Sequence, residues 1–141
     1  MKTAFATATV VLLAMTFAFT ANSDEPAEEK TALSYNTSDI GRELLDTLAD
    51  SYELRFQEYR SGRSGPARLL EINRELYEQQ RESVAADQRL IVAEQFLARA
   101  KEINAIAEIH LKHGTGTRMD LLDTRASQLR ATIELENVAA L

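Results

Sequence analysis

Two related stretches decide the fold of this chain: SGRSGPARLLE at residues 61–71 and HGTGTRMDLLD at residues 113–123. In each, a run rich in Leu, Ile, Phe or Tyr ends at a glycine, a short turn follows, and a Leu-Leu pair with an acid behind it opens the next run. Superposing Gly62 on Gly114 aligns the two Leu-Leu-acid groups. This repetition predicts one supersecondary unit, a helix, a tight turn and a second helix, that occurs twice in the chain.

The sequence on both sides of these stretches has the spacing of amphipathic helices. Apolar residues recur at steps of three and four, which predicts helices at 39–61, from 66 to about 83–87, from about 90 to 114, and from 117 onward. Asp39 is expected to cap the first helix. The expected core positions are Leu45, Leu48, Tyr52, Phe56 and Tyr59 in the first helix, Leu69, Ile72 and Leu76 in the second, Leu90, Leu97, Ile103, Ile106 and Leu111 in the third, and Leu122, Ala126, Leu129 and Ile133 in the last.

These elements predict an all-α fold. The chain has only 5 Gly and 2 Pro, too few to supply the turns of a sheet-rich domain. Because neither repeat alone can bury its apolar face, we expect two antiparallel helical hairpins that form a four-helix bundle with both glycine turns at one end. That arrangement needs a reversal of the chain at residues 83–89. The signal there is weak, so the alternative is an elongated coiled coil with one continuous helix from residue 66 to residue 113.

The composition argues against several functions. A chain of 141 residues is one domain at most. The absence of Cys excludes a disulfide framework, a thiolate zinc site, a Cys nucleophile and a lipid anchor on cysteine. A net charge of -6, with basic residues interspersed among acids, argues against nucleic-acid binding. No Ser/His/Asp order and no glycine-rich phosphate loop is present, so we expect neither an enzyme nor a bound cofactor.

The N-terminal segment has the pattern of an export signal. A basic Lys2 precedes an apolar stretch at residues 4–18, and small residues stand ahead of Asp24 at the positions that a signal peptidase reads. Residues 1–23 are therefore expected to be cleaved; the alternative is an uncleaved anchor helix. Residues 24–38 are acidic and polar without apolar periodicity, which predicts a disordered linker before the helical domain at residues 39–141.

The second stretch also carries a resemblance to a known family. The segment GTGTRMDLL at residues 114–122 resembles the helical-hairpin tip of the TolC-type outer-membrane efflux family, whose pattern is a Gly, a Thr or Ser three residues later, and Asp-Val/Leu-Leu at plus six to plus eight. That family carries the tip twice in each chain. Gly62 occupies the place of the first copy, with Gly65 instead of Ser or Thr and Arg68 instead of Asp.

The resemblance implies a role in export. In that family, trimers of such hairpins build a periplasmic tunnel, acids at the tips ring its aperture, and the glycine turns dock a periplasmic adaptor. By matching position, the docking residues would be Gly62, Gly65, Gly114, Gly116 and Thr117, and the aperture acids Asp120 and Asp123. Without the resemblance, both acids are residues that the dipole favours at a helix start. If the turn docks an adaptor, exchanging both acids for Asn is expected to leave folding nearly unchanged and to alter only electrostatic, salt-sensitive association.

The resemblance covers about residues 40–141 and omits the membrane part of the family. No segment alternates apolar and polar residues as the strands of a membrane barrel do, and the helices are too short for the long family tunnel. A complete exit duct is therefore not expected from this chain alone. The implied partners are a periplasmic adaptor or efflux component and further copies of the chain, as a trimer or another homo-oligomer. The implied location is the periplasm or cell envelope, in association with the outer membrane.

Three hypotheses follow. The chain is an exported accessory of an efflux or secretion system that engages its partner through the hairpin tips, or it is a stand-alone helical interaction protein of the envelope without a transport role. The third hypothesis is a bundle that binds a small ligand or metal. Only His110 and His113 and the general acidity favour it, and since no third ligand is spaced to join the two His, no metal site is expected.

Overall fold

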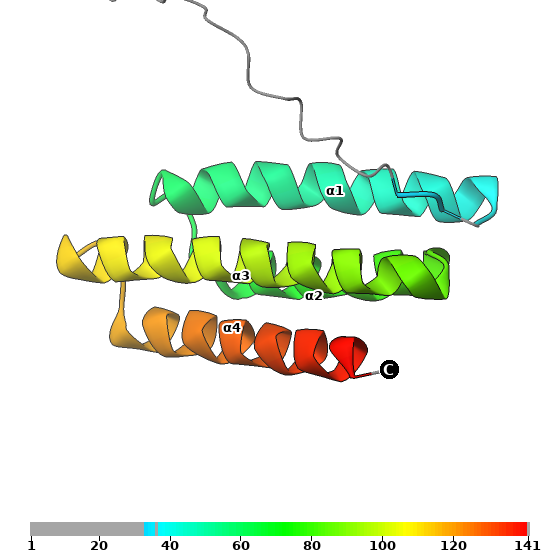
Figure 1. The fold of residues 1–141 in the computed structure, drawn as a ribbon. Helices are drawn as coiled ribbons and strands as arrows, with labels where there is room; N and C mark the ends of the chain where they lie inside the picture. The colour runs from blue at the N-terminus through cyan, green and yellow to red at the C-terminus, as the bar shows by residue number, and fades with distance from the viewer. Residues whose placement is uncertain (1–32, 36, 141) are drawn as a thin grey trace, which may run out of the picture. The chain divides into compact units, whose positions relative to one another are not determined.

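The computed structural model describes residues 33–35 and 37–140, and this part of the chain is all-helical, as predicted (Figure 1). Its elements are α1 (Asp39–Arg60), α2 (Ala67–Ser83), the short 3-10 helix η1 (Ala86–Gln88), α3 (Arg89–Lys112) and α4 (Arg118–Ala139). Within the described ranges no helix is long and apolar enough to cross a membrane. The expected export signal and the first part of the expected linker lie outside these residues.

Consecutive helices run in opposite directions, so the turns after α1 and after α3 lie at the same end (Figure 1). The most extensive contact joins α3 to α4, and α2 packs against both α1 and α3. In Figure 1, α1 and α4 lie on opposite sides of α3, while α2 lies behind it. Each α-helix thus has a neighbour along its length, which is the way amphipathic helices bury their apolar faces.

The alternative of one continuous helix from residue 66 to residue 113 is wrong, because α2 ends at Ser83 and α3 begins at Arg89. Val84 has extended backbone angles (φ -98°, ψ 157°), and so does Ala85 (φ -65°, ψ 159°). The Val84 side chain is buried, and its backbone forms an isolated antiparallel bridge with Tyr35. The reversal is therefore stabilised by a contact with a distant segment, which local sequence signals do not report.

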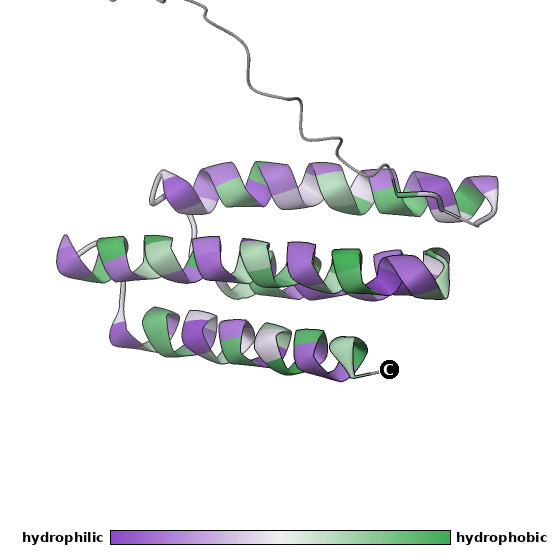
Figure 2. Cartoon of the chain, in the orientation of Figure 1, coloured by the Kyte–Doolittle hydropathy of each residue, from purple (hydrophilic) through white to green (hydrophobic). Residues whose placement is uncertain are grey.

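Two clusters of buried side chains form the core. The first joins α1, α2 and α3 and comprises Leu45, Tyr52, Phe56, Tyr59, Leu69, Ile72, Leu76, Ile103 and Ala107. The second joins α2, α3 and α4 and comprises Tyr77, Val84, Val92, Ala93, Phe96, Leu97, Ala100 and Ala131. Nearly all the core positions expected on the first two helices belong to the first cluster. Figure 2 shows the corresponding alternation of apolar and polar residues along the helices.

Two features at the N-terminal side of α1 differ from expectation. Ser38, not Asp39, is the N-cap: its side chain accepts a hydrogen bond from the Gly41 N–H at 3.2 Å, and Asp39 is the first helical residue. Leu33 and Tyr35 fall within the expected linker, yet they pack against the second cluster. The packed part of the chain therefore begins before Asp39, because two apolar side chains of the preceding segment find a place on the core.

The prediction that the large aliphatic residues of α4 face the core is wrong. Leu122, Leu129 and Ile133 are half or more exposed, at 54%, 50% and 55%. The residues of α4 that are buried against the rest of the fold are small: Thr124, Ser127 and Ala131. Small side chains allow two helices to approach closely, and α3 contributes buried Ala93 and Ala100 to the adjoining cluster. Packing against α3 thus selects the small face of α4 and leaves the large aliphatic face outside.

Candidate functional site

The first glycine turn closes α1 with a Schellman motif. The Arg63 N–H donates to the Glu58 carbonyl at 2.9 Å, and the Gly62 N–H donates to the Tyr59 carbonyl at 2.9 Å. Gly62 has φ +71°, the left-handed conformation that this motif requires and that glycine adopts without steric cost. Gly65 has no such requirement: its φ is not in the left-handed region, and no atom of the described residues lies within 4 Å of the position a Cβ would take.

The second turn closes α3 with the same motif. The Thr115 N–H donates to the His110 carbonyl at 2.9 Å, the Gly114 N–H donates to the Leu111 carbonyl at 3.1 Å, and Gly114 also has φ +71°. The His110 carbonyl accepts a further bond from the Gly116 N–H at 3.1 Å. A Cβ on Gly116 would lie 2.8 Å from the His110 Cβ, so the close approach of the chain to α3 requires glycine here.

Thr117 and Asp120 form a capping box at the start of α4. The Thr117 hydroxyl accepts from the Asp120 N–H at 3.0 Å, and the Asp120 carboxylate accepts from the Thr117 N–H at 2.9 Å. Both groups therefore satisfy backbone donors that a helix start leaves free. Asp123 lies in the next turn of α4 and is exposed. In this chain the two acids have different tasks: Asp120 caps a helix, and Asp123 has no hydrogen-bond or ion-pair partner among the described residues.

The two turns share one cavity of about 270 Å³ at their common end. Of the sequence-predicted residues, Gly62, Gly65, Gly116 and Asp120 line it, while Gly114, Thr117 and Asp123 do not. The other lining residues are Tyr59, Arg63, Ser64, His110 and Thr115. The structure therefore brings together part of the predicted docking set and adds side chains from both helix ends.

Tyr59 is the central side chain of this cavity. Its residue is only 2% exposed, yet its hydroxyl has no hydrogen-bond partner among the described residues. Burial, with a smaller contribution from the negative charge of Asp120, raises the pKa of Tyr59 to about 12. A buried hydroxyl without a partner costs free energy that a water molecule or an incoming polar group would recover. Sequence spacing identified Tyr59 as a core residue but gave no signal for its free hydroxyl.

His110 joins the first turn to the second. Its ring meets the Tyr59 ring edge to face, with centroids 5.1 Å apart, and its Nε2 lies 3.4 Å from the Arg60 carbonyl oxygen. His113 is the C-cap of α3 and is exposed. In the part of the chain that the structure describes, no group of three or more His, Asp or Glu side chains is placed to hold a metal ion. The His110 ring, from the last turn of α3, thus packs against the end of α1.

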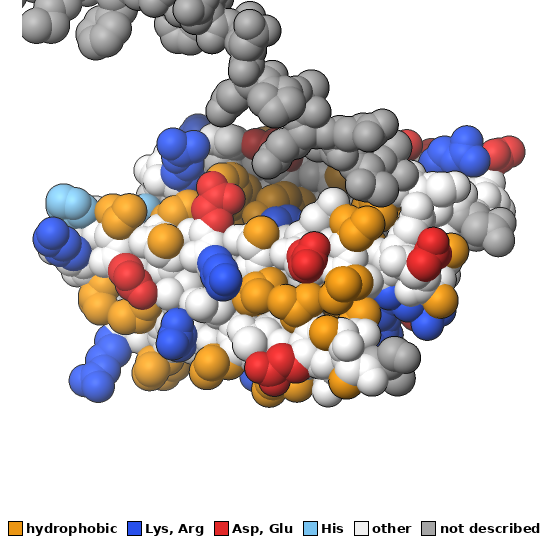
Figure 3. Space-filling model, viewed as in Figure 1, with side chains coloured by type: hydrophobic (Ala, Val, Ile, Leu, Met, Phe, Trp, Pro, Cys, Tyr) orange, Lys and Arg blue, Asp and Glu red, His pale blue; other side chains and the backbone are white. Residues whose placement is uncertain are grey.

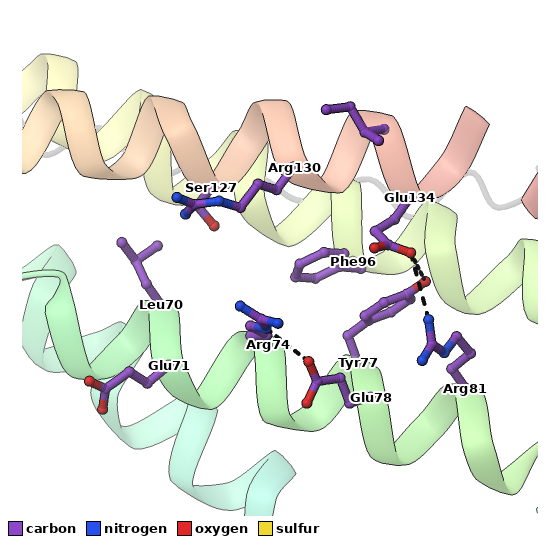
Figure 4. A pocket seen from close by; sticks show the side chains of 11 residues that line it. Leu70, Glu71, Arg74, Tyr77, Glu78, Arg81, Phe96, Ser127, Arg130 and Glu134 are labelled. Atoms are coloured by element: carbon purple, nitrogen blue, oxygen red, sulfur yellow. Dashed lines mark hydrogen bonds and ion pairs between the residues drawn. The ribbon is translucent and has the colours of Figure 1, made fainter. Parts of the chain in front are cut away.

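A second hollow, which the sequence did not indicate, lies between α2 and α4 (Figure 4). Tyr77 of α2 stacks on Phe96 of α3 at 4.4 Å, and these rings form the apolar floor. Glu134 of α4 accepts a hydrogen bond from the Tyr77 hydroxyl at 3.3 Å and lies 3.6 Å from the Arg81 guanidinium. These contacts connect α4 to α2 across the hollow. Both acidic and basic side chains line the hollow, so its charge favours neither an anionic nor a cationic ligand.

Polar contacts in the interior also connect α3 to each of the other three α-helices. The Arg99 Nε donates to the Asn73 Oδ1 at 2.7 Å, and the Arg99 guanidinium lies over the Tyr52 ring at 5.7 Å. Desolvation in this position lowers the pKa of Arg99. The Asn104 Oδ1 lies 3.2 Å from the Thr124 hydroxyl on α4. These groups fix the helices relative to one another, since a buried polar group has few acceptable partners.

Comparison of the chain with protein-family models, curated proteins and solved structures finds no match. The described residues form an all-helical fold in which two glycine turns with the same helix closure meet at one polar cavity.

Proposed function

We propose that this chain is an exported helical protein that binds a partner through its paired glycine turns, as an accessory of an efflux or secretion system of the TolC type. The observation that carries the proposal is the shared cavity between the turns, with the buried Tyr59 hydroxyl left without a partner among the described residues. A surface whose backbone is fixed by two Schellman motifs is already ordered before a partner arrives.

The resemblance supplies the kind of partner. The glycine spacing and the Asp-Leu-Leu group resemble the tips that dock a periplasmic adaptor, and the repeated turn geometry at one end of the fold supports two such tips acting together. In this proposal the chain consists of two copies of one helical hairpin, and its turn end contacts the adaptor or a full-length efflux component. Asp120 holds the start of α4 through its capping box with Thr117, and the aperture role of Asp120 and Asp123 stays a prediction from the resemblance.

Tyr59→Phe tests the proposal most cleanly, because it removes one oxygen atom and keeps the buried ring. Since the hydroxyl makes no bond within the described residues, the variant should unfold at the same temperature as the wild type or slightly above it. Capture of the adaptor from envelope extracts should nevertheless weaken. Tyr77→Phe is the matched control, since its hydroxyl bonds to Glu134 within the fold and lies outside the turn end.

Gly114→Val provides the complementary test, because it disturbs the backbone of the turn. Partner capture should be lost at temperatures where circular dichroism shows that the helices remain. The proposal is abandoned if Gly114→Val and Tyr59→Phe both capture the adaptor as the wild type does.

A second candidate is a stand-alone helical interaction protein of the envelope without a transport role. The exposed aliphatic face of α4 favours it, since exposed apolar stripes mark interaction surfaces. This candidate predicts association that is indifferent to both turn variants and sensitive to substitutions on α4.

A further inference from the structure

The aliphatic residues that α4 leaves exposed form one continuous stripe. Met119, Leu122, Leu129 and Ile133 are 64%, 54%, 50% and 55% exposed, and the half-buried Ala126 completes the row. The stripe lies on the side of α4 opposite to the buried small residues Thr124, Ser127 and Ala131, because the two sets are about half a turn apart at 3.6 residues per turn. Figure 3 shows hydrophobic side chains along α4 between scattered charged ones.

The stripe has the spacing of a coiled-coil seam. Its five residues follow one another at alternating steps of three and four, the pattern in which a helix packs against a second helix along its length. A row of large aliphatic side chains on one helix face is not a scattered set of single exposed residues, which would need no explanation. The exposed apolar residues of α1, such as Leu54 at 62%, do not extend this row, since they lie on another helix.

We infer that α4 pairs in an antiparallel manner with α4 of a second copy of this chain. The charged residues beside the stripe indicate that its partner is a second copy of this chain. Asp123 and Arg130 border the stripe on the same side, where Arg130 also lines the hollow between α2 and α4, and neither makes an ion pair or hydrogen bond with another described residue. In an antiparallel pair with its two-fold axis near Ala126, Asp123 of each copy faces Arg130 of the other, so the same attraction occurs twice.

A parallel pair would be less complementary, because its attraction between Arg118 and Asp123 of the other copy is offset by a repulsion. Residues on opposite flanks of the seam would then face each other, and Arg125 would approach Arg130 of the other copy. Ala126 favours the antiparallel pair as well, because a small side chain near the axis lets the two helices approach closely. No residue of the stripe is among those that line the cavity between the turns, so the proposal does not rest on the proposed function.

The expected association is weak. A seam of five side chains buries less area than the roughly 1,600 Å² of a standard interface, so the dimer should form reversibly and depend on concentration. Sedimentation velocity of the full chain from about 1 μM to about 1 mM should show a monomer that converts to a dimer. Leu129→Glu should remain monomeric over this range. Leu54→Glu is the matched control, since it places the same charge at a similarly exposed leucine on α1, and it should dimerise as the wild type does.

A charge exchange tests the orientation. Asp123→Arg and Arg130→Asp should each weaken dimerisation at low salt, on the order of tenfold in Kd, because each puts like charges together twice. An equimolar mixture of the two single variants should dimerise better than either alone, since at both contacts an arginine of one variant then faces an aspartate of the other. The double variant should also recover. Circular dichroism on each variant checks that the helices are intact.

The proposal is overturned if the wild type stays monomeric at the highest concentration, if Leu129→Glu dimerises like Leu54→Glu, or if the mixture dimerises no better than its components. A trimer would equally overturn it, because the two-fold pairing closes at two copies.

Discussion

The two glycine turns have the same closure and different continuations. Gly62 and Gly114 both have φ +71° and complete the same pair of Schellman hydrogen bonds. After the first turn, α2 begins behind Pro66 without a side-chain cap. After the second, α4 begins with the Thr117 and Asp120 capping box. Both copies thus end their first helix with the same backbone hydrogen bonds. Only the second copy has side chains that cap the start of the following helix.

Because of this difference, residues of the second turn are needed for the fold where the corresponding residues of the first turn are not. In the second turn, Gly116 packs against α3 and the Asp120 carboxylate bonds to Thr117, so both are committed to the fold. In the first turn, Gly65 has open space around it, and Arg68 forms an exposed ion pair with Glu71 at 2.9 Å. The less constrained first turn is therefore the side of the shared cavity that can change with little loss of stability.

The largest difference is expected between Gly116→Ala and Gly65→Ala. The Gly116 variant should destabilise the fold by about 1–3 kcal/mol, because the new methyl group would clash with the His110 side chain and the backbone of α3. The Gly65 variant should be neutral or stabilise by up to about 1 kcal/mol through the unfolded state. Urea denaturation followed by circular dichroism measures both. Equal losses of stability would mean that the two turns are packed alike, which would contradict the difference between Gly65 and Gly116.

The next largest effect is expected at the two left-handed glycines. Gly62→Val and Gly114→Val should each cost about 1–2 kcal/mol, and the two losses should agree, because φ is the same and no neighbour lies within 4 Å of either Cβ position. Thermal unfolding of both variants decides this. A loss at only one of the two would show that the closures are not equivalent in solution.

A smaller effect is expected at the helix starts. Thr117→Ala should destabilise by about 1 kcal/mol, since it removes the side-chain partner of the Asp120 N–H. Asp120→Asn should also lower the melting temperature slightly, because an amide oxygen accepts from the Thr117 N–H less strongly than a carboxylate does. The resemblance leads us to expect nearly unchanged folding, and this measurement decides between the two expectations. Arg68→Ala, at the corresponding place of the first copy, should leave the melting temperature unchanged. Differential scanning calorimetry compares the three, and a clear loss for Arg68→Ala would contradict the asymmetry.

The smallest effect at neutral pH is expected from the tyrosine between the turns. Burial raises the pKa of Tyr59 to about 12, so the folded chain keeps a phenolic proton that the unfolded chain releases near its ordinary pKa of 10. Stability should be unaffected below pH 10 and should fall as the pH rises from about 10 to about 12. Burial also raises the pKa of Tyr52 to about 12, which adds to the same fall.

Tyr59→Phe should flatten part of this alkaline loss without changing stability at pH 7. Asp120→Asn should lower the pKa of Tyr59, because the Asp120 charge helps to keep the phenol protonated. Absorbance titration of tyrosine ionisation, with Tyr52→Phe and Tyr77→Phe as reference variants, identifies the part that belongs to Tyr59, since burial raises the pKa of Tyr77 as well. An unchanged titration curve in Asp120→Asn would show that the two turns are not coupled through this pair.

Much of the site followed from short-range sequence patterns. A glycine after an apolar run predicts a left-handed helix end, and both glycines that were expected to end helices have that conformation. The free Tyr59 hydroxyl and the close packing of Gly116 on His110 were not predictable, because each depends on where another helix lies. The aperture role of Asp120 and Asp123 remains a prediction from the resemblance, although the capping box now gives Asp120 a structural task.

Short-range patterns were enough to predict the helical class, the two turns and the buried faces of α1 and α2, because hydrophobic periodicity and the preference of glycine for a helix end act over a few residues. The buried face of α4 could not be predicted in this way, because it depends on how α4 packs against α3. Both faces of that helix have helical spacing, and the closer contact with α3 selected Thr124, Ser127 and Ala131 over the larger aliphatic side chains. The tertiary structure also decided the reversal after Ser83, since Val84 leaves the helix to occupy the core beside Tyr35, a residue far away in the sequence.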